Sequence, residues 1–211
     1  MSKEIQLTYS SKNTYSTLNE LTNHTETIWM AFHGMGYLSR YFIKYFKDLD
    51  ADKNFIIAPQ APSKYYLDNT YKHVGASWLT RENTSQETEN VLSYVDAVWA
   101  KEKPKQFKRL IVMGYSQGVS IATRWLASRQ IKCDKLLLHS GGIPNELEKG
   151  QFDFLEGSTR VIFLYGKHDP YINVERIKLE STKARMLFND KVEIVEFDGK
   201  HEVYTDYLAT L

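Results

Sequence analysis

The sequence predicts an α/β protein with a mostly parallel sheet and helices on both of its faces. Short apolar runs, rich in β-branched and aromatic residues, alternate with segments of helical length. Most of these runs are almost continuously apolar, which is typical of strands covered on both faces. The predicted strands are residues 27–32, 54–58, 109–113, 135–138, 161–165 and 192–195. The last run alternates apolar and polar residues, so it is predicted to be an edge strand.

Helices are predicted where apolar residues recur every three or four positions. They cover residues 38–49, 85–103, 117–129 and 174–188, with a short last helix within 201–211. Thr84 or Ser85 is the expected N-cap of the second helix, because a side-chain oxygen there can accept from a free backbone N–H. At the N-terminus, Ile5–Tyr9 and Tyr15–Leu18 are predicted to form a leading hairpin.

Length and composition fit a single domain spanning residues 1–211. With 27 basic and 26 acidic side chains, the net charge of +1 provides no electrostatic basis for binding nucleic acid or a membrane surface. The one cysteine, Cys133, excludes an internal disulfide and a cysteine-cluster zinc site. No secretory signal pattern and no apolar run of about 18 residues is present, so we expect a cytoplasmic protein that is not integral to a membrane.

The strongest chemical signal is the motif Gly114-Tyr115-Ser116-Gln117-Gly118, which lies directly between a predicted strand and a predicted helix. A G-x-S-x-G motif in this position is the nucleophile elbow of α/β hydrolases. The sharp turn strains the serine backbone and leaves little room for side chains at the two glycines. Ser116 is therefore predicted to be a nucleophile above the sheet, facing the positive end of the helix dipole.

A nucleophilic serine needs a base and an acid that orients the base, and this fold supplies them in the chain order serine, acid, histidine. Asp169 and His201 each follow a later predicted strand, so we expect them to complete a catalytic triad with Ser116. Three alternatives stay open: Asp169 is an ordinary turn residue, His201 caps a helix, or Asp198 is the acid of His201 in place of Asp169. His139 lies one strand too early and is expected to support the site.

A tetrahedral intermediate also needs two backbone N–H donors for its oxyanion. One is expected from Gln117, the residue after the nucleophile. The other is expected from His33-Gly34-Met35-Gly36, which follows the strand 27–32, because the two glycines free the backbone to aim the Met35 amide. A core position for the Met35 side chain is the alternative, and it is compatible with this role of the amide.

With these motifs, the sequence resembles the phospholipase/carboxylesterase family of α/β hydrolases, which includes bacterial carboxylesterases and acyl-protein thioesterases. The resemblance runs over roughly residues 26–203. It depends on the motifs above together with Ala58-Pro59-Gln60-Ala61-Pro62, Ser77-Trp78, Ser140-Gly141, Gly166-Lys167-His168-Asp169 and Lys200-His201-Glu202. It implies an α/β-hydrolase fold, the triad Ser116, Asp169 and His201, the oxyanion donors Met35 and Gln117, and chemistry without a metal or organic cofactor.

The sequence departs from the family where the substrate pocket is expected. Tyr37 replaces a frequently acidic residue, the residues after Ser77 and Trp78 differ, and the stretch 65–71 is unusually aromatic. The substrate preference of the family is therefore not transferred. Trp78, Tyr37 and Tyr66 are candidate substrate contacts in an apolar acyl wall. Packing against the flank of the sheet is the alternative for each of them.

The sequence thus predicts a serine hydrolase that cleaves carboxylic esters of short acyl chains through an acyl-enzyme, with a small-molecule ester or thioester as its substrate. An acyl thioesterase or lysophospholipase that prefers long chains is the alternative within catalysis. A ligand-binding protein without turnover on the same fold is the alternative outside it. An intact serine, acid and histidine in the right order argue against the binding protein, which has no need of them.

Overall fold

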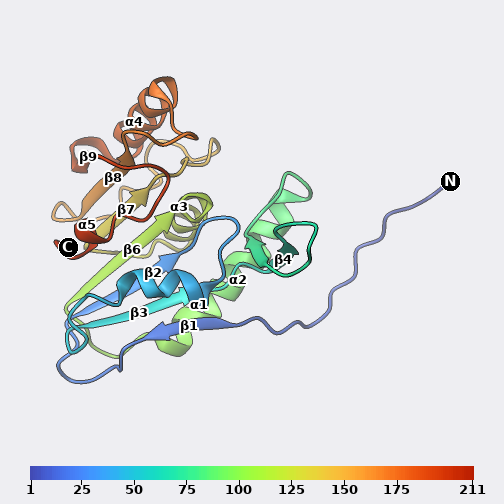
Figure 1. The fold of residues 1–211 in the computed structure, drawn as a ribbon, viewed down its shortest axis with the longest axis horizontal. Helices are drawn as coiled ribbons and strands as arrows, with labels where there is room; N and C mark the ends of the chain where they lie inside the picture. Colours follow the sequence, from blue (N-terminus) through green and yellow to red (C-terminus); the bar gives the residue numbers. More distant parts are fainter.

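The computed structural model describes residues 1–211 apart from the side chain of Asp190. Its main sheet has seven strands in the order β1-β3-β2-β6-β7-β8-β9, as Figure 1 shows. The strands are β1 (Tyr15–Leu18), β2 (Thr27–Phe32), β3 (Asn54–Pro59), β6 (Arg109–Tyr115), β7 (Lys135–His139), β8 (Arg160–Gly166) and β9 (Val192–Phe197). Neighbouring strands are parallel except β1 and β3. The predicted fold class and the predicted edge strand, β9, are confirmed.

Side chains of the central strands alternate between two apolar cores, one on each face of the sheet. In β2, Met30 and Phe32 join the core under α2, α3 and α4, whereas Trp29 and Ala31 join the core under α1, η1 and α5. Both faces are covered, so every residue of β2 is buried and the strand is apolar throughout. The helices are α1 (Ser39–Phe42), the 3₁₀ helix η1 (Ile43–Phe46), α2 (Thr84–Glu102), α3 (Gln117–Arg129), α4 (Val174–Phe188), the 3₁₀ helix η2 (Asn189–Lys191) and α5 (Thr205–Leu208).

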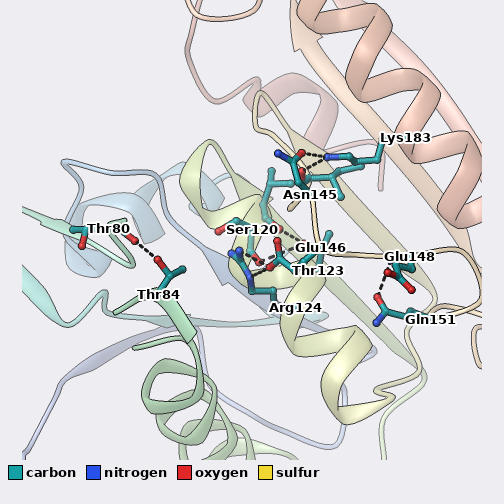
Figure 2. Close-up of polar contacts among 12 residues, drawn as sticks. Thr80, Thr84, Ser120, Thr123, Arg124, Asn145, Glu146, Glu148, Gln151 and Lys183 are labelled. Atoms are coloured by element: carbon teal, nitrogen blue, oxygen red, sulfur yellow. Dashed lines mark hydrogen bonds and ion pairs between the residues drawn. The ribbon is translucent and has the colours of Figure 1, made fainter. Parts of the chain in front are cut away.

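Three of the five predicted helices match the structure closely, and two are shorter than predicted. The predicted helix 38–49 is divided into α1 and η1, and the last helix covers only α5. The predicted N-cap of α2 is also wrong, because Asn83 holds that position with a φ of 48° and without a side-chain cap. The Thr84 hydroxyl donates instead to the Thr80 carbonyl, 3.0 Å away, a contact visible in Figure 2.

The predicted leading hairpin is wrong. β1 pairs antiparallel with β3, and Ile5–Tyr9 forms no strand. The first anchor of the chain is Asn13, whose side-chain amide donates to the Gln60 carbonyl at 2.7 Å. Figure 1 shows the preceding chain running away from the sheet. Alternation of apolar and polar residues predicts that a segment forms a strand, but it does not predict which strand the segment pairs with. Here β1 pairs with β3 on the side away from β2.

A small hairpin outside the main sheet was not predicted. It pairs β4 (Ser63–Tyr66) with β5 (Val74–Ser77), and it carries most of the aromatic stretch noted in the sequence. Figure 1 shows it standing apart from the seven-stranded sheet. β5 becomes buried toward its end, where it approaches the loop after β2.

The long segment between β7 and β8 contains no helix or strand and is fastened by polar contacts, which Figure 2 shows. Arg124 of α3 pairs with Glu146 at 2.6 Å, and Lys183 of α4 donates to the Asn145 side chain at 2.5 Å. These contacts hold the segment against α3 and α4. Among the described residues, no helix is long and apolar enough to span a membrane.

Removal of residues 2–12 should leave the free energy of unfolding within about 0.5 kcal/mol of wild type. In the described part of the chain, residues 1–12 are all exposed and make no hydrogen bond. Urea unfolding measures the change. Removal of residues 2–18 is the control, since it deletes β1 and should clearly destabilise the protein. A large loss from the shorter deletion would mean that the tail pairs with the fold.

Candidate active site

The residues predicted for the site gather at one edge of the sheet. Ser116 follows β6, the loop 33–36 follows β2, Asp169 lies beyond β8, and His201 lies beyond β9. These strands are parallel neighbours or near neighbours, so their carboxyl ends meet at the same edge. Residues distant in sequence are thereby brought into one cluster.

The turn at Ser116 is sharp and strained. The serine has a φ of 52° and a ψ of −119°, outside the regions that ordinary residues favour. A Cβ added at Gly118 would lie 2.1 Å from the Phe32 carbonyl oxygen, so only glycine allows α3 to begin this close to β2. The Ser116 amide donates to the His139 carbonyl at 2.8 Å, which ties the turn to the end of β7.

A chain of hydrogen bonds links Ser116, His201 and Asp169. His201 Nε2 lies 3.1 Å from Ser116 Oγ, and His201 Nδ1 lies 2.7 Å from Asp169 Oδ2. The Asp169 side chain has no exposed area, and its other oxygen accepts from the Tyr171 amide at 2.8 Å. The alternative acid, Asp198, is 90% exposed and contacts His168 instead, at 3.1 Å. The structure therefore joins His201 to Asp169.

Aromatic side chains that the sequence analysis missed hold His201 in place. The Tyr115 hydroxyl donates to the His201 carbonyl at 2.9 Å, and the Tyr115 ring lies 5.3 Å from the imidazole. The exposed ring of Tyr171 meets the imidazole edge-on at 4.9 Å. Tyr115 lies next to the nucleophile in sequence and Tyr171 lies two residues beyond Asp169, so their positions in the chain were the available signal.

The two predicted oxyanion donors are free to bind a ligand. Among the described residues, neither the Met35 nor the Gln117 backbone N–H has a hydrogen-bond acceptor in the protein. The next amide, that of Gly36, donates to the Ala76 carbonyl at 2.9 Å. The Met35 side chain is 60% exposed, so the alternative of a core position for it is wrong.

Two buried histidines support the loops of the site in their neutral form. Burial lowers the pKa of His33 to about 4 and that of His139 to about 3. His33 Nε2 accepts from the Ala61 amide at 3.1 Å, and His139 Nε2 accepts from the Tyr204 amide at 3.0 Å. Each ring uses its lone pair in this bond, so protonation would break the bond as well as bury a charge. The expected supporting role of His139 fits these contacts.

The three candidate substrate contacts differ in exposure. Trp78 is 1% exposed and Tyr37 packs against Phe42 and Tyr115, as the packing alternative describes. Tyr66 is exposed and lies in β4, where successive side chains point to opposite faces of the hairpin. Its ring contacts the ring of Tyr71, with the two centroids 5.1 Å apart.

The side chains of the hairpin that do approach the site are its neighbours in β4 and the following turn. A Cβ added at Gly36 would lie 3.6 Å from Leu67 Cδ2 and 3.8 Å from the Tyr65 hydroxyl. Leu67 was not identified from the sequence. If β4 had been predicted, the alternation of its side chains would have placed Tyr65 and Leu67 on one face and Tyr66 on the other.

Two hollows lie at the opposite, amino-terminal edge of the sheet. One, of about 530 Å³, is lined by residues 157–160, 189, 191 and 193, and the other, of about 430 Å³, by residues 23–26, 50, 52, 53 and 108. Neither borders Ser116. Among the described residues, no group of three or more histidine, cysteine, aspartate and glutamate side chains is arranged to hold a metal ion.

Comparison with known proteins finds a family model that matches the chain and solved structures that resemble it. The model of the phospholipase/carboxylesterase family matches residues 13–211. The chain is also similar in structure to acyl-protein thioesterase 2 of Zea mays, with 14% identity over 94% of this chain and 97% of that chain and a TM-score of 0.72. A carboxylesterase of Bacillus cereus gives 15% identity, coverage of 94% and 91%, and a TM-score of 0.65. At such identities the likeness establishes the fold alone, and no curated protein sequence matches the chain.

Stability should fall as the pH drops from about 6.5 toward 4. Unfolded histidines take up protons below their ordinary pKa of 6.5, whereas His33 and His139 resist protonation in the folded protein until about pH 4 and 3. The unfolded state therefore binds more protons in this window, and each histidine can cost up to about 1.4 kcal/mol per pH unit. Urea unfolding at several pH values measures the slope. His139→Asn should make the slope shallower, and an unchanged slope in this variant would contradict the assignment.

Proposed function

Because the chain belongs to the phospholipase/carboxylesterase family of α/β hydrolases, we propose that it is a serine esterase that hydrolyses short-acyl carboxylic esters through an acyl-enzyme. Family membership identifies the chain as an esterase- or thioesterase-type hydrolase. The ester substrate, the triad and the covalent intermediate are our proposal. The observation that carries it is the hydrogen-bond chain from Ser116 through His201 to buried Asp169.

In the proposed reaction, His201 Nε2 accepts the hydroxyl proton while Ser116 Oγ attacks the acyl carbonyl carbon. Asp169 holds the other imidazole nitrogen as a donor and stabilises the imidazolium. His201 then gives the proton to the leaving alcohol, and the C–O bond to that alcohol breaks. Water attacks the acyl-enzyme with His201 again as base, which releases the acid and restores Ser116.

The proposed oxyanion hole consists of the Met35 and Gln117 amides. In its support, the neighbouring Gly36 amide is already bonded to Ala76 while the Met35 amide is not. Gln117 is the first residue of α3, so its amide belongs to the unsatisfied positive end of that helix. Removal of one such donor typically lowers kcat about 10²–10³-fold.

The preference for short acyl chains rests on the shape of this edge of the sheet. Trp78 is 1% exposed, so its ring offers no open wall to a long acyl chain, and the exposed apolar side chains beside Gly36 are Leu67 and Tyr65. A short acyl group needs only the open surface beside Leu67 and Tyr65, with Tyr37 and Trp78 supporting it from within. Tyr66, which faces away from Gly36, contributes to the outer surface of the hairpin.

We propose also that residues 1–211 form one domain that works in the cytoplasm. One continuous sheet runs from β1 to β9, which favours a single folding unit. The one cysteine, Cys133, is a buried free thiol, which suits a reducing compartment.

A fluorophosphonate probe should label wild-type protein at Ser116, as peptide mapping would reveal. Ser116→Ala should take no label and lose at least about 10³-fold in ester hydrolysis, because the attacking group is gone. Ser120→Ala is the matched control, one turn further along α3 (Figure 2), and should behave as wild type.

p-Nitrophenyl esters of two to twelve carbons should be cleaved fastest at the short end. Faster cleavage of long chains would favour a long-chain thioesterase or lysophospholipase, and no label would favour a binding protein.

Asp169→Asn should lower kcat by about 10⁴-fold, the size of the effect in serine proteases, because the imidazole loses the partner that fixes its tautomer. Asp198→Asn provides the matched comparison. Its carboxylate is exposed and contacts His168, so kcat should change by less than about twofold. Steady-state kinetics on a short ester measure both. If Asp198→Asn were the damaging change, the acid would have to be reassigned.

A further inference from the structure

We infer that the segment Gly75–Leu79, from β5 into the following loop, is a brace that sets the geometry of the oxyanion hole, and that the Gln117 side chain is the positioning group that fastens it. This inference rests on the proposed function of the site. It concerns the Gln117 carboxamide, whereas the proposed oxyanion donor is the Gln117 backbone amide.

One side of the brace contacts the loop that carries Met35. The Gly36 amide donates to the Ala76 carbonyl at 2.9 Å, and the Trp78 indole N–H donates to the His33 carbonyl at 2.7 Å. The backbones also touch, because a Cβ added at Gly75 would lie 2.6 Å from the Gly36 carbonyl oxygen. The peptide of Met35 is therefore held on both sides by the brace.

The other side of the brace is bonded to the elbow through one side chain. Gln117 Oε1 accepts from the Trp78 amide at 2.8 Å, and Gln117 Nε2 donates to the Leu79 carbonyl at 2.7 Å. Nε2 also lies 3.1 Å from the Ser77 hydroxyl. A carboxamide suits this position because it presents an acceptor to a backbone N–H and a donor to a backbone C=O at once.

The brace thus spans the two loops that supply the oxyanion donors. β2 and β6 are paired only as far as Phe32 and Gly114, and the two loops lie beyond that pair. Ala76, Ser77 and Trp78 are all buried, so the brace cannot shift without disturbing packed side chains. Because an oxyanion donor must lie within a few tenths of an ångström of its position, loosening the brace should weaken transition-state binding specifically.

Gln117→Glu and Gln117→Met test this inference. Glutamate keeps the shape but sets a carboxylate oxygen against the Leu79 carbonyl, and methionine keeps the length but removes every hydrogen bond. Per site counted by saturating fluorophosphonate labelling, kcat on p-nitrophenyl acetate should fall about 10–100-fold in both, with KM within about threefold of wild type. Gln86→Met, on the exposed face of α2, is the matched control and should match wild type.

Two further measurements separate positioning from a general structural defect. The affinity of a trifluoromethyl ketone, which forms a tetrahedral oxyanion adduct with serine, should fall by the same factor as kcat/KM. In Gln117→Met, which adds no charge, the apparent pKa of the acidic limb of kcat/KM should not move, because the pair of His201 and Asp169 is untouched. If kcat per titrated site stays at the wild-type value, or if only the fraction of active protein falls, the inference is overturned.

Trp78→Phe keeps the inference testable if both Gln117 variants fail to fold. It keeps an aromatic ring and removes the indole donor to His33 together with part of the buried ring volume, so kcat per titrated site should fall and the ketone should bind more weakly. Wild-type levels of both would overturn the inference. Failure of the proposed function has a different signature, since wild-type protein would then show neither label on Ser116 nor hydrolysis of the ester.

Discussion

The close approach of α3 to the end of β2 is the constraint on which the rest of this site depends. Gly118 lies against the Phe32 carbonyl, so the chain must turn from β6 into α3 within one residue, and that residue is Ser116. Its positive φ is a strain that the packed sheet and helix maintain. The same turn lifts the hydroxyl toward His201 and begins α3 with an unsatisfied amide at Gln117.

Around this turn, buried polar groups act through satisfied hydrogen bonds rather than through charge. His33 and His139 are neutral, and each accepts a backbone N–H that anchors a neighbouring loop. The neutral Gln117 carboxamide likewise uses hydrogen bonds to join the turn at Ser116 to the brace. Neutral groups of this kind fix loops without the desolvation cost of a buried ion, whereas the buried carboxylate of Asp169 is paired with His201.

The small hairpin of β4 and β5 contributes both to the alignment of the proposed oxyanion donors and to the apolar surface beside them. β5 leads into the brace, while Leu67 and Tyr65 lie beside Gly36. Apolar contact with a substrate and alignment of the proposed oxyanion donors therefore belong to one element. Apart from Tyr37, the departures of this chain from its family lie in this hairpin and in the loop after it. This arrangement gives a physical reason why they would alter substrate preference without altering the predicted triad.

The sequence by itself determined the features that depend on local pattern. Continuous apolar runs predicted the buried strands, and the motif around Ser116 together with the order of Asp169 and His201 predicted which side chains would meet. Only the tertiary structure decided the neighbour of β1, the hairpin, the burial of Trp78 and the partners of the Gln117 side chain. Periodicity and turn chemistry are encoded over a few residues. Contacts such as Gln117 with Leu79 depend instead on how distant segments pack, which no local pattern specifies.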